Sequence, residues 1–162
     1  MGCQQNPCAG CGKNACCSAC GQAREIRIRR KDADFLLRFA ELPFLPAVRF
    51  SLRRLNGSSS ESDCLAPVFL SAPSETFPDV CQTAGILTRL LEQKLISVSY
   101  TEPLERFNYS DYVNSAAFTD FCARATGFAV PEIEYGSMAL TALGQEVIDD
   151  LELYVLPRSD KL

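Results

Sequence analysis

Residues 79–100, DVCQTAGILTRLLEQKLISVSY, change from a helical to a strand pattern of hydrophobic positions. In the first part the apolar positions lie four, three and four residues apart, at Val80, Ala84, Leu87 and Leu91, which is the spacing of one helix face. From Ile96 onward every second residue is apolar or aromatic, as in a strand with one buried face. The pattern predicts a helix over 79–94 that leads directly into a strand over 95–100.

The same two periods predict the other elements. Alternation predicts strands over 24–30, 47–55 and 132–140, and short apolar runs predict strands over 64–71 and 153–156. Pro67 limits the strand at 64–71 to an edge of the sheet. Helical spacing predicts helices over 33–42, 111–125 and 142–151, capped by Asp32, Ser110 and Thr141. The small polar residues of 56–63, NGSSSESD, predict a linker or flexible loop.

Length and composition place these elements in one domain with a tail. The chain has 162 residues, which suits a domain over 24–162 preceded by a Cys-rich tail over 1–23. No apolar run approaches the roughly 18 residues of a membrane span, and no signal peptide is evident. A cytoplasmic protein without a membrane partner is therefore expected. The chain has no His, and no phosphate-binding Gly loop or nucleophile elbow, so an enzyme is not expected.

Charge is distributed unevenly along the chain. Residues 24–54 carry nine bases and four acids, a net charge of +5, whereas residues 55–162 carry six bases and sixteen acids, a net charge of −10. With Lys13 in the tail, these sum to the overall −4. A basic segment beside an acidic body can contact an anionic partner, and it can equally pair with that body within the molecule.

Residues 1–22 hold six of the nine cysteines in a duplicated Cys-x-x-Cys-Gly pattern, CAGCGK and CSACGQ. Each copy resembles the knuckle that supplies half of a zinc-ribbon site, because a Gly after the second thiolate permits the required turn. The expected zinc ligands are Cys8, Cys11, Cys17 and Cys20. Cys16 is an alternative to Cys17, and Cys3 is left over. An iron–sulfur cluster, reduced thiols and disulfides are the other interpretations. The apolar surroundings of Cys64, Cys81 and Cys122 predict buried packing residues.

The order of the predicted elements resembles a winged helix-turn-helix domain. The most specific parts are ILTRLLEQKLISVSY at 86–100 and SMALTALGQEVIDDL at 137–151, in which Leu-Thr-x-x-Gly marks a strand-to-helix junction. The resemblance implies an α+β fold with a winged-helix-like core of three to four helices and a small antiparallel sheet. The two-stranded wing would be interrupted by a helical insertion over 103–131. It also implies DNA binding through the second of the paired helices.

Two functions follow as expectations. The first is a DNA-binding or transcription-associated protein that responds to zinc or redox state through its N-terminal cysteines. Double-stranded DNA would then be read by Gln82, Thr83 and Arg89 and held by Arg27 and Arg29. The alternative is a non-catalytic protein–protein interaction module that does not bind DNA. It would meet a second copy or another protein partner through the aromatic insertion 103–131.

Overall fold

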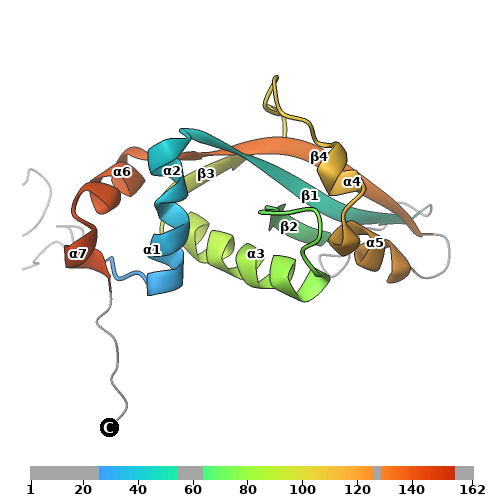
Figure 1. Ribbon diagram of the computed structural model, residues 1–162, viewed down its shortest axis with the longest axis horizontal. Helices are drawn as coiled ribbons and strands as arrows, with labels where there is room; N and C mark the ends of the chain where they lie inside the picture. The colour runs from blue at the N-terminus through green and yellow to red at the C-terminus, as the bar shows by residue number, and fades with distance from the viewer. Residues whose placement is uncertain (1–25, 55–63, 126–128, 156–162) are drawn as a thin grey trace, which may run out of the picture.

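The computed structural model describes residues 26–54, 64–125 and 129–155, and within them a curled four-stranded antiparallel sheet forms the centre of the molecule (Figure 1). The strands follow the order β2-β1-β4-β3. Their bounds are β1 Phe44–Arg54, β2 Cys64–Val68, β3 Ile96–Ser99 and β4 Ala129–Leu140. The mixed helix-and-sheet class with a small antiparallel sheet is confirmed, and β2 occupies the edge position that its proline predicts.

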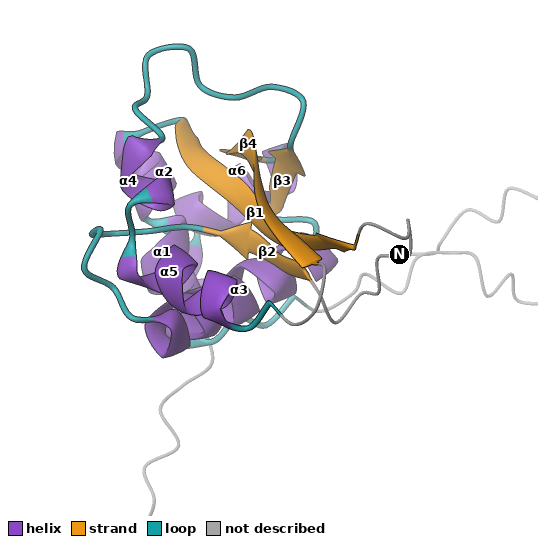
Figure 2. Cartoon of the chain, turned by 90° about the vertical axis from the view of Figure 1, so that its right-hand side faces the viewer, coloured by secondary structure: helices purple, strands orange, loops and turns teal. Residues whose placement is uncertain are grey.

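Helices lie below this curled sheet and at both of its ends (Figure 1 and Figure 2). Their bounds are α1 Arg30–Leu36, α2 Arg38–Glu41, α3 Phe77–Glu92, α4 Ser110–Val113, α5 Ala116–Ala123, α6 Ala142–Asp149 and α7 Leu151–Tyr154. The longest of them, α3, runs below the long β1–β4 ribbon, with α1, α6 and α7 at one end of the molecule and α4 and α5 at the other (Figure 1). The two ends are therefore built from different helices on a shared ribbon.

The predicted helix-to-strand unit is present, and local backbone chemistry defines both ends of its helix. A capping box between Thr76 and Asp79 begins α3 two residues before the predicted start. At the other end Lys94 adopts a left-handed φ of 60°, and the N–H of Leu95 donates to the carbonyl of Leu90 at 2.9 Å. This Schellman motif brings two fully buried leucines together and leads the chain into β3.

The Leu-Thr-x-x-Gly sequence forms the junction between β4 and α6. The Thr141 hydroxyl donates to the carbonyl of Lys94 at 2.6 Å and accepts from the N–H of Gly144 at 3.0 Å, so it caps α6 as predicted. A Cβ at Gly144 would collide with the Leu95 carbonyl oxygen. The start of α6 is thus held against the end of α3. Since β3 pairs with β4 from Ile96↔Leu140 to Ser99↔Ser137, the two strands expected to form a wing are joined.

The first helix differs from the expected 33–42. It starts earlier, at Arg30, and is divided at Leu37 into α1 and α2. Asp32 was predicted to cap it from outside, but the structure places Asp32 in its first turn, where it is only 1% exposed. The prediction was wrong because Asp32 has a distant partner on α3, which outweighs its preference for a cap position.

Two predicted strands are not strands. In the segment 24–30, of which residues 24 and 25 lie outside the described ranges, Ile28 forms only a single parallel bridge to Val155. The expected strand 153–156 begins inside the last helix turn, α7, and its last residue is not described. The first segment has the alternation of a strand and the second is a short apolar run, but they meet at a helical end, where Ile28 is completely buried, instead of joining the sheet.

The predicted helix 111–125 is interrupted. It forms two short helices, α4 and α5, because Ser115 takes an extended backbone conformation between them. The Ser115 hydroxyl donates to the carbonyl of Tyr112 at 2.8 Å and accepts from the N–H of Phe118 at 3.0 Å. This side chain therefore ends one helix and caps the next. As a result Tyr112 enters the core and Val113 is exposed.

The hydrophobic core consists of two clusters. The first cluster joins α1, the second half of α3, β3 and α6, and its largest fully buried members are Ile28, Leu36, Leu87, Leu90, Leu95 and Met138. The second cluster joins β2, α4 and α5, and includes Val48, Phe50, Val68, Val80, Tyr112 and Phe121. Along β1 the buried positions change from Leu45 and Ala47 in the first to Val48, Phe50 and Leu52 in the second. Because successive strand residues face opposite ways, the two halves of β1 bury opposite faces.

Candidate functional site

A buried ion pair joins α1 to α3. The guanidinium of Arg89 contacts the carboxylate of Asp32 with both Nη2 and Nε, at 2.6 Å and 3.0 Å. The Asp32 side chain is 2% exposed and that of Arg89 is 32% exposed. This hydrogen bond raises the pKa of Arg89, and burial acts in the opposite direction. The two-point contact fixes the orientation of the Arg89 side chain and holds its positive charge against Asp32.

The five residues predicted to contact DNA lie along α3, beside its end and just before α1. Gln82 is exposed and Thr83 half-buried in the first half of α3, whereas Arg27 lies beside the end of α3, where its carbonyl accepts from Gln93 at 3.4 Å. Eleven helical residues separate the two places, which corresponds to roughly 16 Å at 1.5 Å per residue. Arg29 is exposed immediately before α1.

Part of the basic segment is paired with acids of β4. Arg49 contacts Glu134 at 2.8 Å, and Arg53 contacts Glu132 at 2.7 Å. The Arg49 guanidinium also lies 4.1 Å from the centroid of the Tyr100 ring. Burial raises the pKa of Tyr100, and Arg49 partly offsets that rise. For these cations the structure favours pairing within the molecule.

Aromatic residues of the segment 103–131 gather against β4. The ring of Tyr109 lies 4.9 Å from Phe107 and 4.8 Å from Tyr135, centroid to centroid. The Tyr109 hydroxyl donates to the carbonyl of Gly136 at 2.6 Å and accepts from the N–H of Leu104 at 2.9 Å. Tyr109 is buried, whereas Phe107 is 38% and Tyr135 39% exposed. We call these three residues the aromatic surface.

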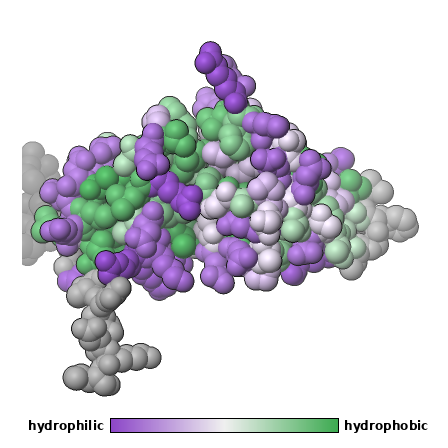
Figure 3. Space-filling view, in the orientation of Figure 1, coloured by the Kyte–Doolittle hydropathy of each residue, from purple (hydrophilic) through white to green (hydrophobic). Residues whose placement is uncertain are grey.

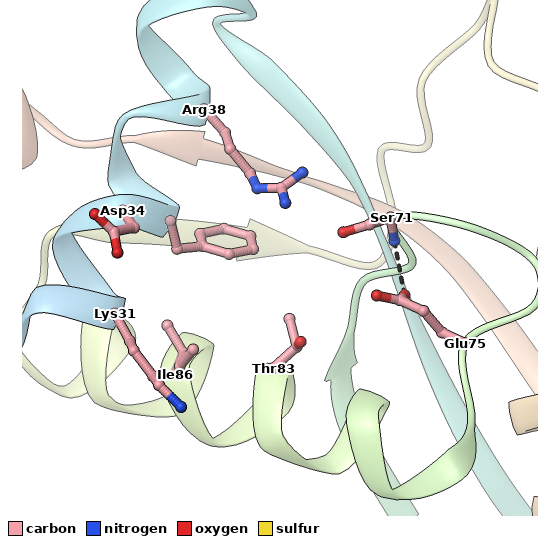
Figure 4. A pocket seen from close by; sticks show the side chains of 8 residues that line it. Lys31, Asp34, Arg38, Ser71, Glu75, Thr83 and Ile86 are labelled. Atoms are coloured by element: carbon pink, nitrogen blue, oxygen red, sulfur yellow. Dashed lines mark hydrogen bonds between the residues drawn. The ribbon is translucent and has the colours of Figure 1, made fainter.

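An open groove of about 280 Å³ lies between α1, the loop before α3, and α3 itself (Figure 4). Its lining combines two cations, two acids, two hydroxyls and two apolar side chains: Lys31, Arg38, Asp34, Glu75, Ser71, Thr83, Phe35 and Ile86. The Arg38 side chain points from α2 into the groove, opposite Glu75 and Ser71 (Figure 4). Of this set, only Thr83 was predicted from the sequence to be a site residue. The groove had no motif that could reveal it, because the residues come from segments up to 55 positions apart.

The expected zinc ligands Cys8, Cys11, Cys17 and Cys20 lie outside the described residues. Within 26–54, 64–125 and 129–155 no group of three potential metal ligands occurs. Cys64 is exposed and Cys81 and Cys122 are half-buried, so the expectation of three buried packing residues was wrong. Desolvation by neighbouring atoms raises the pKa of each of these thiols, which keeps them protonated and weakly nucleophilic at neutral pH.

No protein-family model, curated protein or solved structure matches this chain.

Apolar and polar residues are mixed over the surface of the molecule, and an apolar region lies towards the end formed by α1, α6 and α7 (Figure 3). Across the described segments, none of the helices has both the length and the apolar character needed to cross a membrane.

Proposed function

We propose that this chain is a non-catalytic protein–protein interaction module with a winged-helix-like core, in which α3 is a structural helix and not a DNA reader. The observation that carries the proposal is the bidentate contact between Arg89 and buried Asp32. A guanidinium committed in this way uses two of its five N–H donors on Asp32, and its orientation is set by that carboxylate and not by a base edge.

Moving Arg89 to DNA would leave the Asp32 carboxylate buried without a partner. Breaking a buried pair in this way costs about 3–5 kcal/mol when both groups are fully buried, and somewhat less where one partner reaches solvent, as Arg89 does. The exposed residues of α3 offer no compensating cation, since they are Pro78, Asp79, Gln82, Thr88 and Glu92. The two acids among them, Asp79 and Glu92, would repel phosphates.

The aromatic surface is the proposed contact region. Tyr109 holds Phe107 and Tyr135 in place through ring contacts on both sides, and its hydroxyl is anchored on the backbone. Rigid, partly exposed aromatic side chains lose little conformational entropy on binding and dominate many protein interfaces. Arg106, which is exposed beside Phe107, would contribute a cation at the rim.

Site-specific photocrosslinking in the native host tests this proposal. A photoreactive phenylalanine analogue placed at Phe107 or Tyr135 should give the same crosslinked protein, or a crosslinked dimer of the chain. The matched position on α3, Gln82, is equally exposed to solvent and should give no such product. The proposal fails if neither aromatic position crosslinks to protein, or if Gln82 crosslinks to DNA.

DNA binding through a different surface is a second candidate. Arg29, Arg30 and Lys31 are exposed around the start of α1, and none of them has an ion pair with another described residue. Three adjacent cations would support salt-dependent, sequence-independent contact with phosphates. Anisotropy of a labelled random duplex should then fall steeply between about 20 and 200 mM salt. Arg29→Ala should weaken binding, and no binding at the lowest salt would exclude this candidate.

We also propose that Cys8, Cys11, Cys17 and Cys20 hold one zinc ion, as their spacing indicates. Four thiolates would give the closed tetrahedral shell of a structural site, and any response to redox state would act through the same sulfurs. Elemental analysis of anaerobically prepared protein should find close to one equivalent of zinc. Cys11→Ser should remove it, and less than about half an equivalent in the unaltered chain would refute the site.

A further inference from the structure

We propose that the groove between α1 and α3 binds a free α-amino acid. The Arg38 guanidinium would take the ligand carboxylate, and the Glu75 carboxylate would take its ammonium group (Figure 4). This site does not depend on the proposed interaction function, because none of the groove residues belongs to the aromatic surface.

Arg38 is held in position but not neutralised. Its guanidinium carbon lies 5.6 Å from the ring centroid of Phe35 and 5.4 Å from that of Phe69. These cation–π contacts restrain the side chain, yet they leave the guanidinium N–H fork free to bind a carboxylate at two points. No ion pair joins Arg38 to an acid among the described residues. A cation restrained in this way, above an apolar floor, is suited to an anionic group from outside the chain.

Glu75 is also held in position while part of its carboxylate remains available. Its Oε2 accepts from the backbone N–H of Ser71 at 2.8 Å, which fixes the side chain across the groove from Arg38. The other oxygen, Oε1, takes part in no hydrogen bond with the described residues. The carboxylate and the Arg38 guanidinium lie too far apart to form an ion pair themselves. A molecule with one negative and one positive pole would connect them.

The remaining lining residues suit the rest of an amino acid. Phe35 and Ile86 present apolar surface between α1 and α3, and Thr83 adds a methyl group and a hydroxyl (Figure 4). Lys31 approaches the far end of the groove, where it would favour a ligand side chain that ends in an acceptor. With Lys31 and Arg38 opposed by Asp34 and Glu75, the lining has no net charge, which matches a zwitterion better than a simple anion. The volume of about 280 Å³ lies at the small end of ligand sites.

Calorimetric titration of the full chain with the twenty amino acids, one at a time at millimolar concentration, tests the proposal. At least one should bind, and the corresponding acid without the amine and amine without the acid should each bind at least tenfold more weakly. Arg38→Gln and Glu75→Gln should each reduce the affinity at least tenfold. Arg38→Lys, which keeps the charge and loses the fork, should fall between Arg38→Gln and the unaltered chain.

Matched controls lie outside the groove. Arg124→Gln, at an exposed arginine that also lies over an aromatic ring, and Glu105→Gln make the same chemical changes outside the groove and should leave binding unchanged. Circular dichroism of each variant checks that a loss of binding is not a loss of folding. Three results would overturn the proposal: no amino acid binds, the acid-only analogue binds as well as the amino acid, or the folded Glu75→Gln variant retains full affinity.

Discussion

The two ends of the molecule are stabilised in different ways. At the end that contains the first cluster, three local backbone features position aliphatic side chains. They are the Schellman turn at Lys94, the helix cap at Thr141 and the close approach of Gly144 to Leu95. At the end that contains the second cluster, aromatic rings pack directly on one another, with Phe50 5.0 Å from Phe118 and 5.5 Å from Phe121, centroid to centroid.

This difference has consequences for substitution. Backbone junctions tolerate almost no added atoms, because a peptide group cannot move without its neighbours. Ring packing can adjust by small rotations, and this end also buries the ionisable hydroxyl groups of Tyr109 and Tyr112, for which burial favours the protonated form. We therefore expect the first end to respond most to changes in shape, and the second end to respond to pH.

The largest effect is expected for Gly144→Ala at the first end. The new Cβ would overlap the Leu95 carbonyl oxygen and crowd Leu140, so the junction between α6 and α3 must open. We expect a loss of about 3 kcal/mol or more in the free energy of unfolding, measured by urea denaturation.

Gly85→Ala is the matched control, because it makes the same change in the middle of α3. Its nearest neighbour would be the Arg89 side chain, 3.7 Å from the new Cβ, which is ordinary contact. Replacing a helix-interior glycine should then stabilise the chain by about 0.5–1 kcal/mol. If both variants lost stability equally, the close approach at Gly144 would not be the cause.

Arg89→Met should have the next largest effect, because it leaves Asp32 buried without its partner. We expect a loss of about 2–3 kcal/mol, below the range for a fully buried pair because Arg89 is partly exposed. Adding Asp32→Leu to Arg89→Met should recover most of that loss, since an apolar pair leaves no buried charge. A double-mutant cycle from denaturation curves measures this coupling. Purely additive losses would mean that the ion pair does not join α1 to α3.

The second end should respond to alkaline pH through Tyr112. Burial strongly raises the pKa of this side chain, whose hydroxyl accepts from the N–H of Leu70 at 3.3 Å. In the unfolded chain a tyrosine loses its proton near pH 10. The contribution of Tyr112 to the free energy of unfolding should therefore be fully present below about pH 10 and should decrease as the pH rises above that value. Tyr112→Phe should cost about 1 kcal/mol at pH 7 and make the alkaline loss shallower. Tyr135→Phe, at an exposed tyrosine, should not change that slope.

The sequence predicted the two junctions of the first end, from α3 to β3 and from β4 to α6, because their signals are local. The helix over 79–94 and the strand after it were found from side-chain period, and Thr141 from its place before an apolar helix face. Tertiary contacts overrode local preference at Asp32, which pairs with a residue 57 positions away, and at Ser115, whose buried hydroxyl divides a predicted helix.

The candidate sites were harder to predict than the fold. Arg89 was identified from its position on a polar helix face, but period alone does not show whether that face meets solvent or a buried carboxylate. The groove combines residues of α1, α2, the loop before α3 and α3, and no spacing in the sequence relates Arg38 to Glu75. Such sites depend on packing between elements, so they are visible only once the elements are placed.

The smallest expected effect, and the only stabilising change at a junction, is Lys94→Gly. Lys94 is the one residue other than glycine with positive φ in the described part of the chain, and it lies where the Schellman motif favours glycine. The left-handed conformation costs an ordinary residue about 1–2 kcal/mol, and the greater freedom of unfolded glycine offsets part of the gain. We expect a net increase of about 0.5–1 kcal/mol in the free energy of unfolding. Gln93→Gly, one residue earlier with φ of −81°, should instead reduce stability, and equal effects at both positions would show that the turn at Lys94 carries no strain.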